Sequence, residues 1–263
     1  MNLSTIKNNL RCGIQNKSAK YKLYTLISII VLILLWKLIS LYVDKEILVP
    51  SPEATLMSIF SLVRQKYFWR AVYHTLFRTI TGFIVALVSA LVLGVAAGFI
   101  KPVYYLMKPF NTAIKATPTM SIILLALIWL NSEKAPILVS FLIIFPILYS
   151  NVVEGILNID KNLLEMAELY KVKKRRVITE LYIPSIKSYL FAAATTALGL
   201  NLKVMISAEV LSQPKFAMGR ELQLEKVYLN TANVFAWTIV IIFLAALFDI
   251  ILKRLKLRLE KWK

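Results

Sequence analysis

Two ionisable residues lie in or beside an otherwise apolar stretch of the sequence, and they are the first candidates for chemistry. Lys203 interrupts a run of uncharged residues, and Glu209 follows six residues later. A charge in apolar surroundings loses solvation and is often functional, so Lys203 is a candidate for attracting an anion. Six residues of separation put the two side chains on different faces of a helix, which excludes a direct pair between them.

Other chemistries find few residues to support them. The chain has one cysteine, Cys12, and one histidine, His74. These residues make no internal disulfide and no structural zinc site, so no metal site is expected. No G-x-x-x-x-G-K-[ST] sequence occurs, so ATP is not expected to bind to this chain. A membrane-embedded enzyme is a weak alternative because His74 has no acid, base or metal partner nearby in the sequence.

The composition indicates the environment of these residues. The 263 residues are 59% hydrophobic and 17% charged, with a formal net charge of +18. Soluble domains are about 45–50% apolar and about 25% charged, so a soluble enzyme is nearly excluded. The uncharged runs, several of them near the ~20 residues that cross a bilayer as a helix, are 23–36, 79–100, 116–132, 135–153, 188–202 and 227–248. The sequence thus predicts an all-α integral membrane protein with six transmembrane helices.

The span ends and the orientation follow from the positions of the charges. We extend the first span to 43, begin the third near 103 and extend the fifth to about 208. Alternate loops then contain 21 and eight Lys and Arg residues. Positive loops stay in the cytoplasm, so both termini are predicted to face inward. The six-span domain covers 23–252, between a cytoplasmic tail at 1–22 and a basic cytoplasmic tail at 253–263. The basic excess is a topology signal, and no nucleic-acid partner is expected.

Two local patterns predict helix details. Ser51, Pro52 and Glu53 form a helix start on the outer side, with serine as the N-cap. Apolar residues follow at i, i+3, i+4 and i+7 from Leu56, which predicts an amphipathic helix on the membrane surface or over the outer ends of other spans. Asp249 and Lys253 are four apart and are expected to pair at the inner end of the sixth span.

The longest inward loop, 154–187, is built as a docking surface. Asp160 is expected to cap a helix that runs through Glu168 or beyond. A second helix from about Lys173 to Tyr182 is expected to stop before Pro184, because the residue before a proline is disfavoured in the helical region. The basic residues 173–176 are interpreted as topology determinants and contacts for membrane lipid headgroups rather than contacts for a specific partner.

The same loop resembles that of a known family, the membrane subunits of binding-protein-dependent ABC importers. The family pattern is E-A-A, three residues, G, nine residues, I-x-L-P. Here Glu165, Met166 and Ala167 take the E-A-A positions and Lys171 takes the glycine position. The I-x-L-P positions are occupied by Leu181, Tyr182, Ile183 and Pro184, with the spacing intact.

Further short stretches are similar to the branch that imports nitrate, taurine, alkanesulfonates, bicarbonate or thiamine-precursor pyrimidines. They are Val-Pro-Ser-Pro at 49–52, Phe-Pro-Ile-Leu at 145–148 and Ala-Glu at 208–209. Two departures stand out. A positive φ at the family glycine costs a lysine about 1 kcal/mol, so the loop is expected to turn differently at Lys171. Leu-Asn-Ser-Glu at 130–133 replaces the usual Phe-Gly-x-Gly.

The resemblance implies a type I ABC importer permease with a cytoplasmic coupling-helix loop. It implies dimerisation with a second copy around a pathway, two ATP-binding subunits that hydrolyse ATP with Mg, and an extracytoplasmic solute-binding protein. In this family Glu165 would pair with a basic group on the ATPase; the alternative is an ordinary exposed acid. The expected location is the inner or plasma membrane of a prokaryote.

The pathway candidates are Lys203, Glu209, Pro118 and Pro146. Lys203 either faces the pathway or snorkels to the outer interface, roughly 8 Å away. Glu209 is placed at the outer mouth. The two prolines would kink spans three and four, although proline is also common in membrane helices.

The predicted function is ATP-driven import of a small, anionic or sulfonate-like solute by a chain that is not itself an enzyme. The alternative is a self-sufficient secondary transporter or channel, which would usually place carboxylates within its spans.

Overall fold

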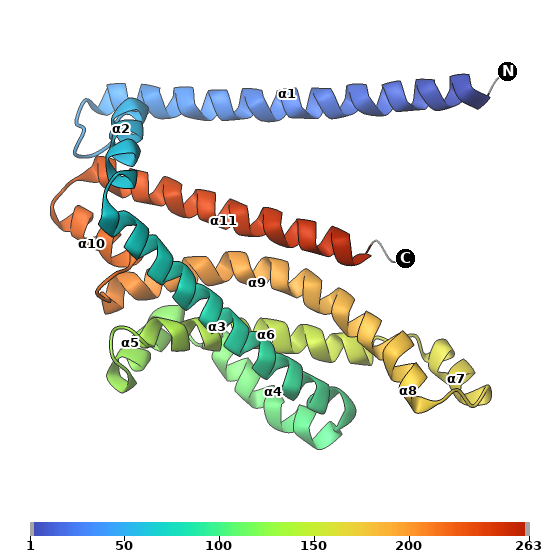
Figure 1. The fold of residues 1–263 in the computed structure, drawn as a ribbon. Coiled ribbons are helices and arrows are strands. Elements are labelled where there is room, and N and C mark those ends of the chain that lie inside the picture. Colours follow the sequence, from blue (N-terminus) through green and yellow to red (C-terminus); the bar gives the residue numbers. More distant parts are fainter. Residues whose placement is uncertain (1–2, 261–263) are drawn as a thin grey trace.

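The structure is a computed structural model that describes the backbone of residues 3–260 and the side chains of residues 23–254. The regular elements in this part of the chain are helices (Figure 1). The long helices are α1 (Leu3–Val43), α3 (Lys66–Phe99), α6 (Ala135–Leu157), α9 (Ile183–Ser212) and α11 (Thr231–Glu260). The shorter elements are α2 (Pro52–Val63), α4 (Lys101–Ala116), α5 (Thr119–Trp129), α7 (Lys161–Leu169), α8 (Lys174–Val177), the π-helical turn η1 (Ile178–Tyr182) and α10 (Met218–Val227).

Five of the described helical segments are long and apolar enough to cross a membrane, and they contain α1, α3, α6, α9 and α11. The pair α4 and α5 is bent by 104° and makes a sixth span if the two helices cross together. The break falls at Thr117, which is extended with ψ of 129° because Pro118 follows it. The predicted all-α membrane fold is confirmed, and the bent pair stands where the third of the six spans is predicted. By contrast, α6 continues through Pro146 as one helix.

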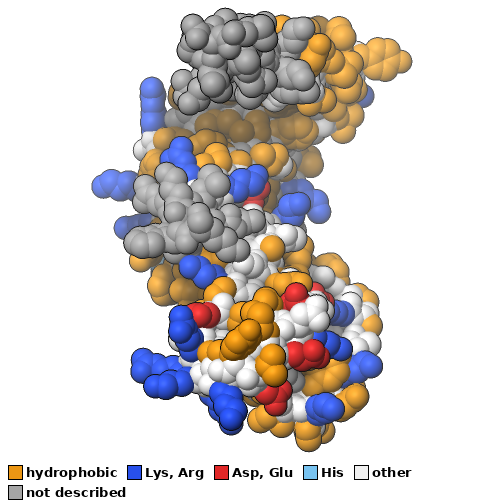
Figure 2. All heavy atoms as spheres, turned by 90° about the vertical axis from the view of Figure 1, so that its right-hand side faces the viewer, with side chains coloured by type: hydrophobic (Ala, Val, Ile, Leu, Met, Phe, Trp, Pro, Cys, Tyr) orange, Lys and Arg blue, Asp and Glu red, His pale blue; other side chains and the backbone are white. Residues whose placement is uncertain are grey.

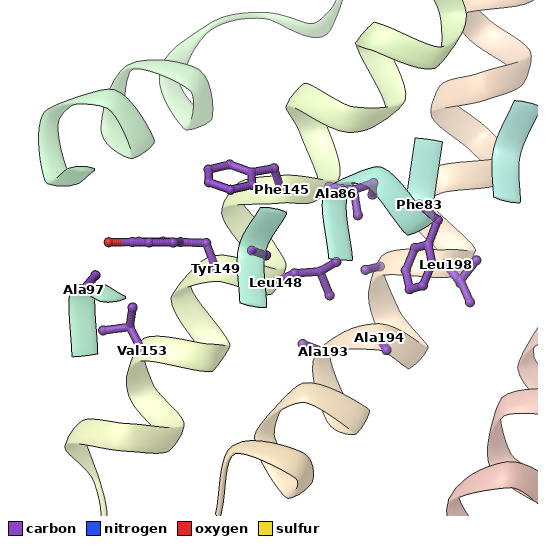
Figure 3. Packing of buried hydrophobic residues seen from close by; sticks show 13 residues of the cluster. Phe83, Ala86, Ala97, Phe145, Leu148, Tyr149, Val153, Ala193, Ala194 and Leu198 are labelled. Carbon is purple, nitrogen blue, oxygen red and sulfur yellow. The ribbon is translucent and has the colours of Figure 1, made fainter. Parts of the chain in front are cut away.

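The main core lies where α3, α6 and α9 pack against one another (Figure 3). Small residues on one face of α3 allow the helix backbones to approach closely, as in many membrane helix pairs. Ala86 and Ala90 are fully buried, and a Cβ added to Gly94 would lie 2.8 Å from Val152 of α6. The close approach of α3 and α6 therefore depends on side chains no larger than a methyl group.

One polar contact joins the same three helices. The Asn201 amide of α9 donates to the Thr79 carbonyl of α3 at 2.9 Å and accepts from Ser140 Oγ of α6 at 2.5 Å. Ser140 also fills the space beside Gly82, where an added Cβ would lie 2.2 Å from its Oγ. Because Asn201 is fully buried, these hydrogen bonds fix α9 in position against its two neighbours.

A second core, around Trp237 of α11, places α2 over the end of the bundle opposite to α7 and α8. Ser51 caps α2 by accepting a hydrogen bond from the Ala54 amide at 3.2 Å, which confirms the predicted N-cap. The face that packs inward contains the buried Leu62, whereas Phe60 is 69% exposed. Much of the apolar stripe predicted for this helix therefore points outward, as expected for a helix at a membrane surface.

Helix α1 is attached to the bundle through its C-terminal part. Trp36 donates from Nε1 to the Pro50 carbonyl at 3.1 Å and stacks on Phe235 of α11 at 5.6 Å. Lys37 pairs with Glu53 of α2 at 2.6 Å. The hydrogen bond from Lys37 lowers the pKa of the Glu53 carboxyl. Figure 1 shows the rest of α1 apart from the other helices, and its apolar side chains 23–35 are largely exposed.

The ends of the chain and the 154–187 loop share one end of the bundle. In Figure 1 the N- and C-terminal ends and helices α7 and α8 lie on the right, whereas α2, α5 and α10 lie on the left. This is the arrangement that the alternation of basic loops predicts, with α7 and α8 on the basic side.

The second helix of this loop does not stop before Pro184, so that prediction was wrong. The chain runs from α8 through η1 directly into α9, and Ile183 has helical dihedral angles. The Ile183 N–H donates to the Ile178 carbonyl five residues back. A π turn is wider than an α turn, so it moves the carbonyl of Glu180 away from the proline ring that would otherwise clash with it. Residues 174–212 therefore form one helical segment.

Candidate functional site

The first part of the site is α7, the helix that carries the E-A-A positions. Asp160 precedes it and accepts a hydrogen bond from the Asn162 amide at 2.9 Å, which confirms the predicted cap. The helix ends at Leu169, close to the predicted end. None of the described residues 160–182 is buried, so the side chains of this loop are accessible to another molecule.

The turn after α7 forms at Lys171, where the importer pattern has glycine. Lys171 has a φ of +51°, so the expectation of a different turn was wrong. The Lys171 amide donates to the Glu168 carbonyl at 3.0 Å, and the Val172 amide donates to the Ala167 carbonyl at 2.9 Å. These two bonds are the Schellman pattern that usually ends a helix with glycine. They offset the strain of about 1 kcal/mol that a lysine pays in the left-handed region.

The two arms of the loop enclose a hollow of about 270 Å³. Its lining is mainly apolar and includes Leu163, Met166, Ala167, Tyr170, Val172 and Leu181. Tyr170 is 74% exposed and Leu169 beside it is 79% exposed. The lower part of Figure 2 shows this end of the molecule, where hydrophobic side chains are surrounded by basic and acidic ones. Such a patch, rimmed by charges, is typical of a protein interface.

The structure brings together only some of the predicted motif residues. Met166 and Ala167 face Leu181 across the hollow. Glu165, Ile183 and Pro184 are exposed but do not line it. The motif therefore divides into a part that joins the two arms of the loop and a part that is free to contact another molecule.

A buried charge network around Arg78, the Arg78 network, ties the ends of α3 and α9 that lie opposite to α7 and α8 together. Arg78 of α3 is 4% exposed, and its Nη1 lies 3.0 Å from Glu209 Oε1 of α9. The same nitrogen donates to the Phe216 carbonyl at 2.9 Å, and Nη2 pairs with Glu133. Glu209 Oε2 accepts from Thr75 Oγ1 at 2.8 Å. Glu209 therefore lies inside the bundle with no surface exposed in the described chain, and its place at the outer mouth of a pathway stays a prediction.

Glu133 links this network to the loop that follows α9. One carboxylate oxygen pairs with Arg78, and the other accepts from the Lys215 amide at 2.9 Å. Partial burial raises the pKa of this carboxyl, but the two hydrogen bonds outweigh burial, so the pKa lies below its ordinary value. Glu133 belongs to the stretch that departs from the importer pattern, and here it serves as a counter-ion for a buried arginine.

Lys203 lies on the opposite face of α9 from this network. It is exposed, and so are Thr196 and Ser207 on the same side of the helix. A Cβ added to Gly199 would meet no atom within 4 Å. Together with Leu200, which is also exposed, these residues form the α9 stripe, a row of mostly small or polar side chains with one cation.

The remaining predicted residues lie apart from one another. Pro118 is exposed at the break between α4 and α5, whereas Pro146 is buried in α6. Lys253 Nζ lies 3.8 Å from Asp249 Oδ2 on the surface of α11, which confirms the predicted pair. His74 packs against the ring of Phe216 at 5.5 Å.

Comparison with known sequences decides the family. The profile of the family described as "binding-protein-dependent transport system inner membrane component" matches residues 90–261, more than half of the chain. The chain belongs to this family. The match contains the coupling-loop positions and the whole of α9, and it confirms the resemblance found in the sequence. The chain is thus the permease component of a binding-protein-dependent ABC importer.

Named relatives of the permease fall in one branch. The permease is 22% identical to the putative aliphatic sulfonates transport permease protein SsuC of Bacillus subtilis. The match extends over 236 residues and covers 89% of this chain and 85% of SsuC. The taurine transport system permease protein TauC of Escherichia coli is 21% identical over 233 residues, 86% of this chain and 84% of TauC. The nitrate import permease protein NrtB of Leptolyngbya laminosa is 24% identical over 150 residues, 56% of this chain and 53% of NrtB.

A solved structure shares the fold. The crystal structure of an amino acid ABC transporter with histidines matches the permease with a TM-score of 0.59 at 16% identity. The match covers 75% of this chain and 94% of that chain. At this identity the likeness supports the arrangement of helices and nothing about the solute.

Sequence reasoning missed Arg78, whose side chain forms three hydrogen bonds in the buried network. The second uncharged run begins at Thr79 and puts Arg78 at its edge, whereas α3 begins at Lys66. A signal was available, since Arg78 and Glu209 each adjoin an apolar run. An arginine and a glutamate buried in the same bundle must find each other or other partners.

Proposed function

We propose that two copies of the permease enclose a path for a small anionic or sulfonate-like solute, driven by two ATPase subunits. The ATPases bind ATP and Mg and dock on the loop 160–182. The observation that carries this proposal is the exposed, apolar-surfaced α7 with the importer motif, followed after the turn at Lys171 by the continuous helical segment 174–212 that contains α9. An extracytoplasmic binding protein delivers the solute. The permease lies in the inner membrane of a prokaryote with both termini in the cytoplasm.

The role of the loop is tested by reversing one charge. Glu165→Lys should abolish transport and uncouple ATP hydrolysis from the solute while leaving membrane insertion intact, because a lysine would repel a basic group on the ATPase. Glu168→Lys is the matched control, since it makes the same change three residues on in the same exposed helix. Normal transport by Glu165→Lys would show that the docking assignment is wrong. Transport is measured in vesicles with and without the ATPase subunits. Transport that needs the ATPase indicates an ATP-driven importer, and transport without it indicates a secondary transporter.

The orientation is tested by chemical labelling. Single cysteines at Ser4 and Lys263, in a Cys12→Ser background, should resist a membrane-impermeant thiol reagent in whole cells. A cysteine at Gln65 should react, since Gln65 lies between α2 and α3 at the end opposite to α7. Labelling of either terminus from outside would contradict the proposed topology.

The anionic solute class has two supports. The relatives are named for aliphatic sulfonates, taurine and nitrate, which all contain an oxyanion. Lys203 lies exposed in the α9 stripe, where a pathway or a second copy can cover it. Uptake should be lost in Lys203→Gln and partly retained in Lys203→Arg, measured at saturating binding protein. Equal activity of the two variants would exclude a role for this charge in the pathway.

A further inference from the structure

A polar groove lies between α4 and α6, and it shares no lining residue with the hollow of the loop 160–182, the Arg78 network or the α9 stripe. It encloses about 200 Å³, far more than the roughly 10–15 Å³ that one water needs. Both helices contribute residues at helical spacing, so two polar stripes face each other. The lining includes Lys108, Asn111 and Lys115 from α4 and Tyr149, Ser150 and Glu154 from α6.

Two buried polar groups in this groove have no hydrogen-bond partner within the described chain. They are Asn111 Oδ1 and the Tyr149 hydroxyl. Asn111 is 7% exposed and Tyr149 is 3% exposed. Figure 3 shows the Tyr149 ring pointing away from α9, with its hydroxyl at the edge of the packed cluster. Buried polar groups are nearly always paired, so two orphans that line one hollow indicate a bound polar group.

The charges in the groove favour an anion. Lys115 Nζ lies 2.9 Å from Ser150 Oγ, and Lys108 lies two turns back on the same face of α4. Neither lysine forms an ion pair with a described residue. The two lysines outnumber the single carboxylate of the lining, Glu154.

The donors match an oxyanion. Each ammonium offers three N–H groups, the Tyr149 hydroxyl offers one, and the Asn111 amide presents its NH₂ group after a half-turn about its last bond. We propose that the groove between α4 and α6 binds a small oxyanion. This rests on the proposed function in one respect: the ion is either the anionic solute on its way to the cytoplasm or the phosphate of a lipid headgroup.

Inorganic sulfate serves as the probe for this site. The purified full chain in detergent should show a saturable rise in Tm with sodium sulfate, compared with sodium chloride at equal ionic strength. Lys115→Gln and Tyr149→Phe should each weaken the apparent sulfate affinity about tenfold. Tyr149→Phe removes only the orphaned hydroxyl, so it keeps the core packing of the ring. The matched control is Lys101→Gln, on the same helix but outside the groove. It should bind sulfate like the unaltered chain.

Native mass spectrometry separates the two sources. A phospholipid that the unaltered chain retains, that Lys115→Gln lacks and that sulfate displaces would identify the ion as a headgroup phosphate. Sulfate binding without such a lipid would identify a free solute. No saturable sulfate effect together with no lipid difference, or an equal effect of Lys101→Gln and Lys115→Gln, would overturn the proposal. Uptake in vesicles is measured separately, so failure of the importer function leaves the binding result intact.

Discussion

Removing Arg78 should destabilise the permease more than removing any exposed arginine. Arg78→Met deletes three hydrogen bonds of a side chain that is 4% exposed, and it leaves Glu209 as a fully buried carboxylate without its cation. Breaking a buried pair by removing one partner costs about 3–5 kcal/mol. With an unfolding entropy of about 2.1 cal/mol/K per residue, this corresponds to a fall in Tm of about 5–9 °C.

The double variant supplies the decisive comparison. Glu209→Gln removes the orphaned charge, so Arg78→Met with Glu209→Gln should unfold at a higher temperature than Arg78→Met alone, because replacing both ions of a buried pair is often nearly neutral. Tm is measured by tryptophan fluorescence in detergent. Arg176→Met is the matched control, since Arg176 forms an exposed pair with Glu180 at 2.8 Å and should change Tm little. Additive destabilisation in the double variant would refute the reasoning.

Three further changes test other parts of the structure. Lys171→Gly should relieve about 1 kcal/mol of left-handed strain and slow amide exchange in α7 about fivefold, as measured by hydrogen exchange. Gly82→Ala should lower Tm, because the added Cβ would meet Ser140 Oγ at 2.2 Å and overpacking costs about 1–3 kcal/mol, whereas Gly199→Ala should be tolerated. Since the folded-state pKa of Glu133 is depressed, its stabilising contribution should be present above its ordinary pKa and lost as pH falls through the lowered value, so acid should lower Tm less in Glu133→Gln.

The features that could be predicted from the sequence are local ones. Ser51 and Asp160 cap helices through bonds to residues two or three positions away, and Asp249 and Lys253 are one helical turn apart. Such contacts depend on the spacing of neighbours, which the sequence shows directly. The apolar runs likewise predicted the membrane helices, since a bilayer leaves few other ways to satisfy the backbone.

The features that could not be predicted depend on helix packing. Arg78 meets Glu209 across 131 residues of sequence, and only the crossing of α3 and α9 brings them together. The same is true of the groove around Lys115 and Tyr149, which needs the placement of α4 beside α6. Lys171 shows a third case, in which the two capping bonds that end α7 outweigh the modest preference of one residue against positive φ.

The unbroken helical segment from 174 to 212 has a mechanical consequence for the Arg78 network. Its 39 residues span about 58 Å at 1.5 Å per residue, and Asn201 is bonded to both neighbouring helices like a fulcrum. The arm from Asn201 to residue 174 is about 40 Å and the arm to Glu209 about 12 Å. A swing of about 2 Å at residue 174 of a rigid lever with these arms displaces Glu209 by about 0.6 Å. A displacement along the 3.0 Å contact with Arg78 would lengthen it to about 3.6 Å, which is too long for a hydrogen bond.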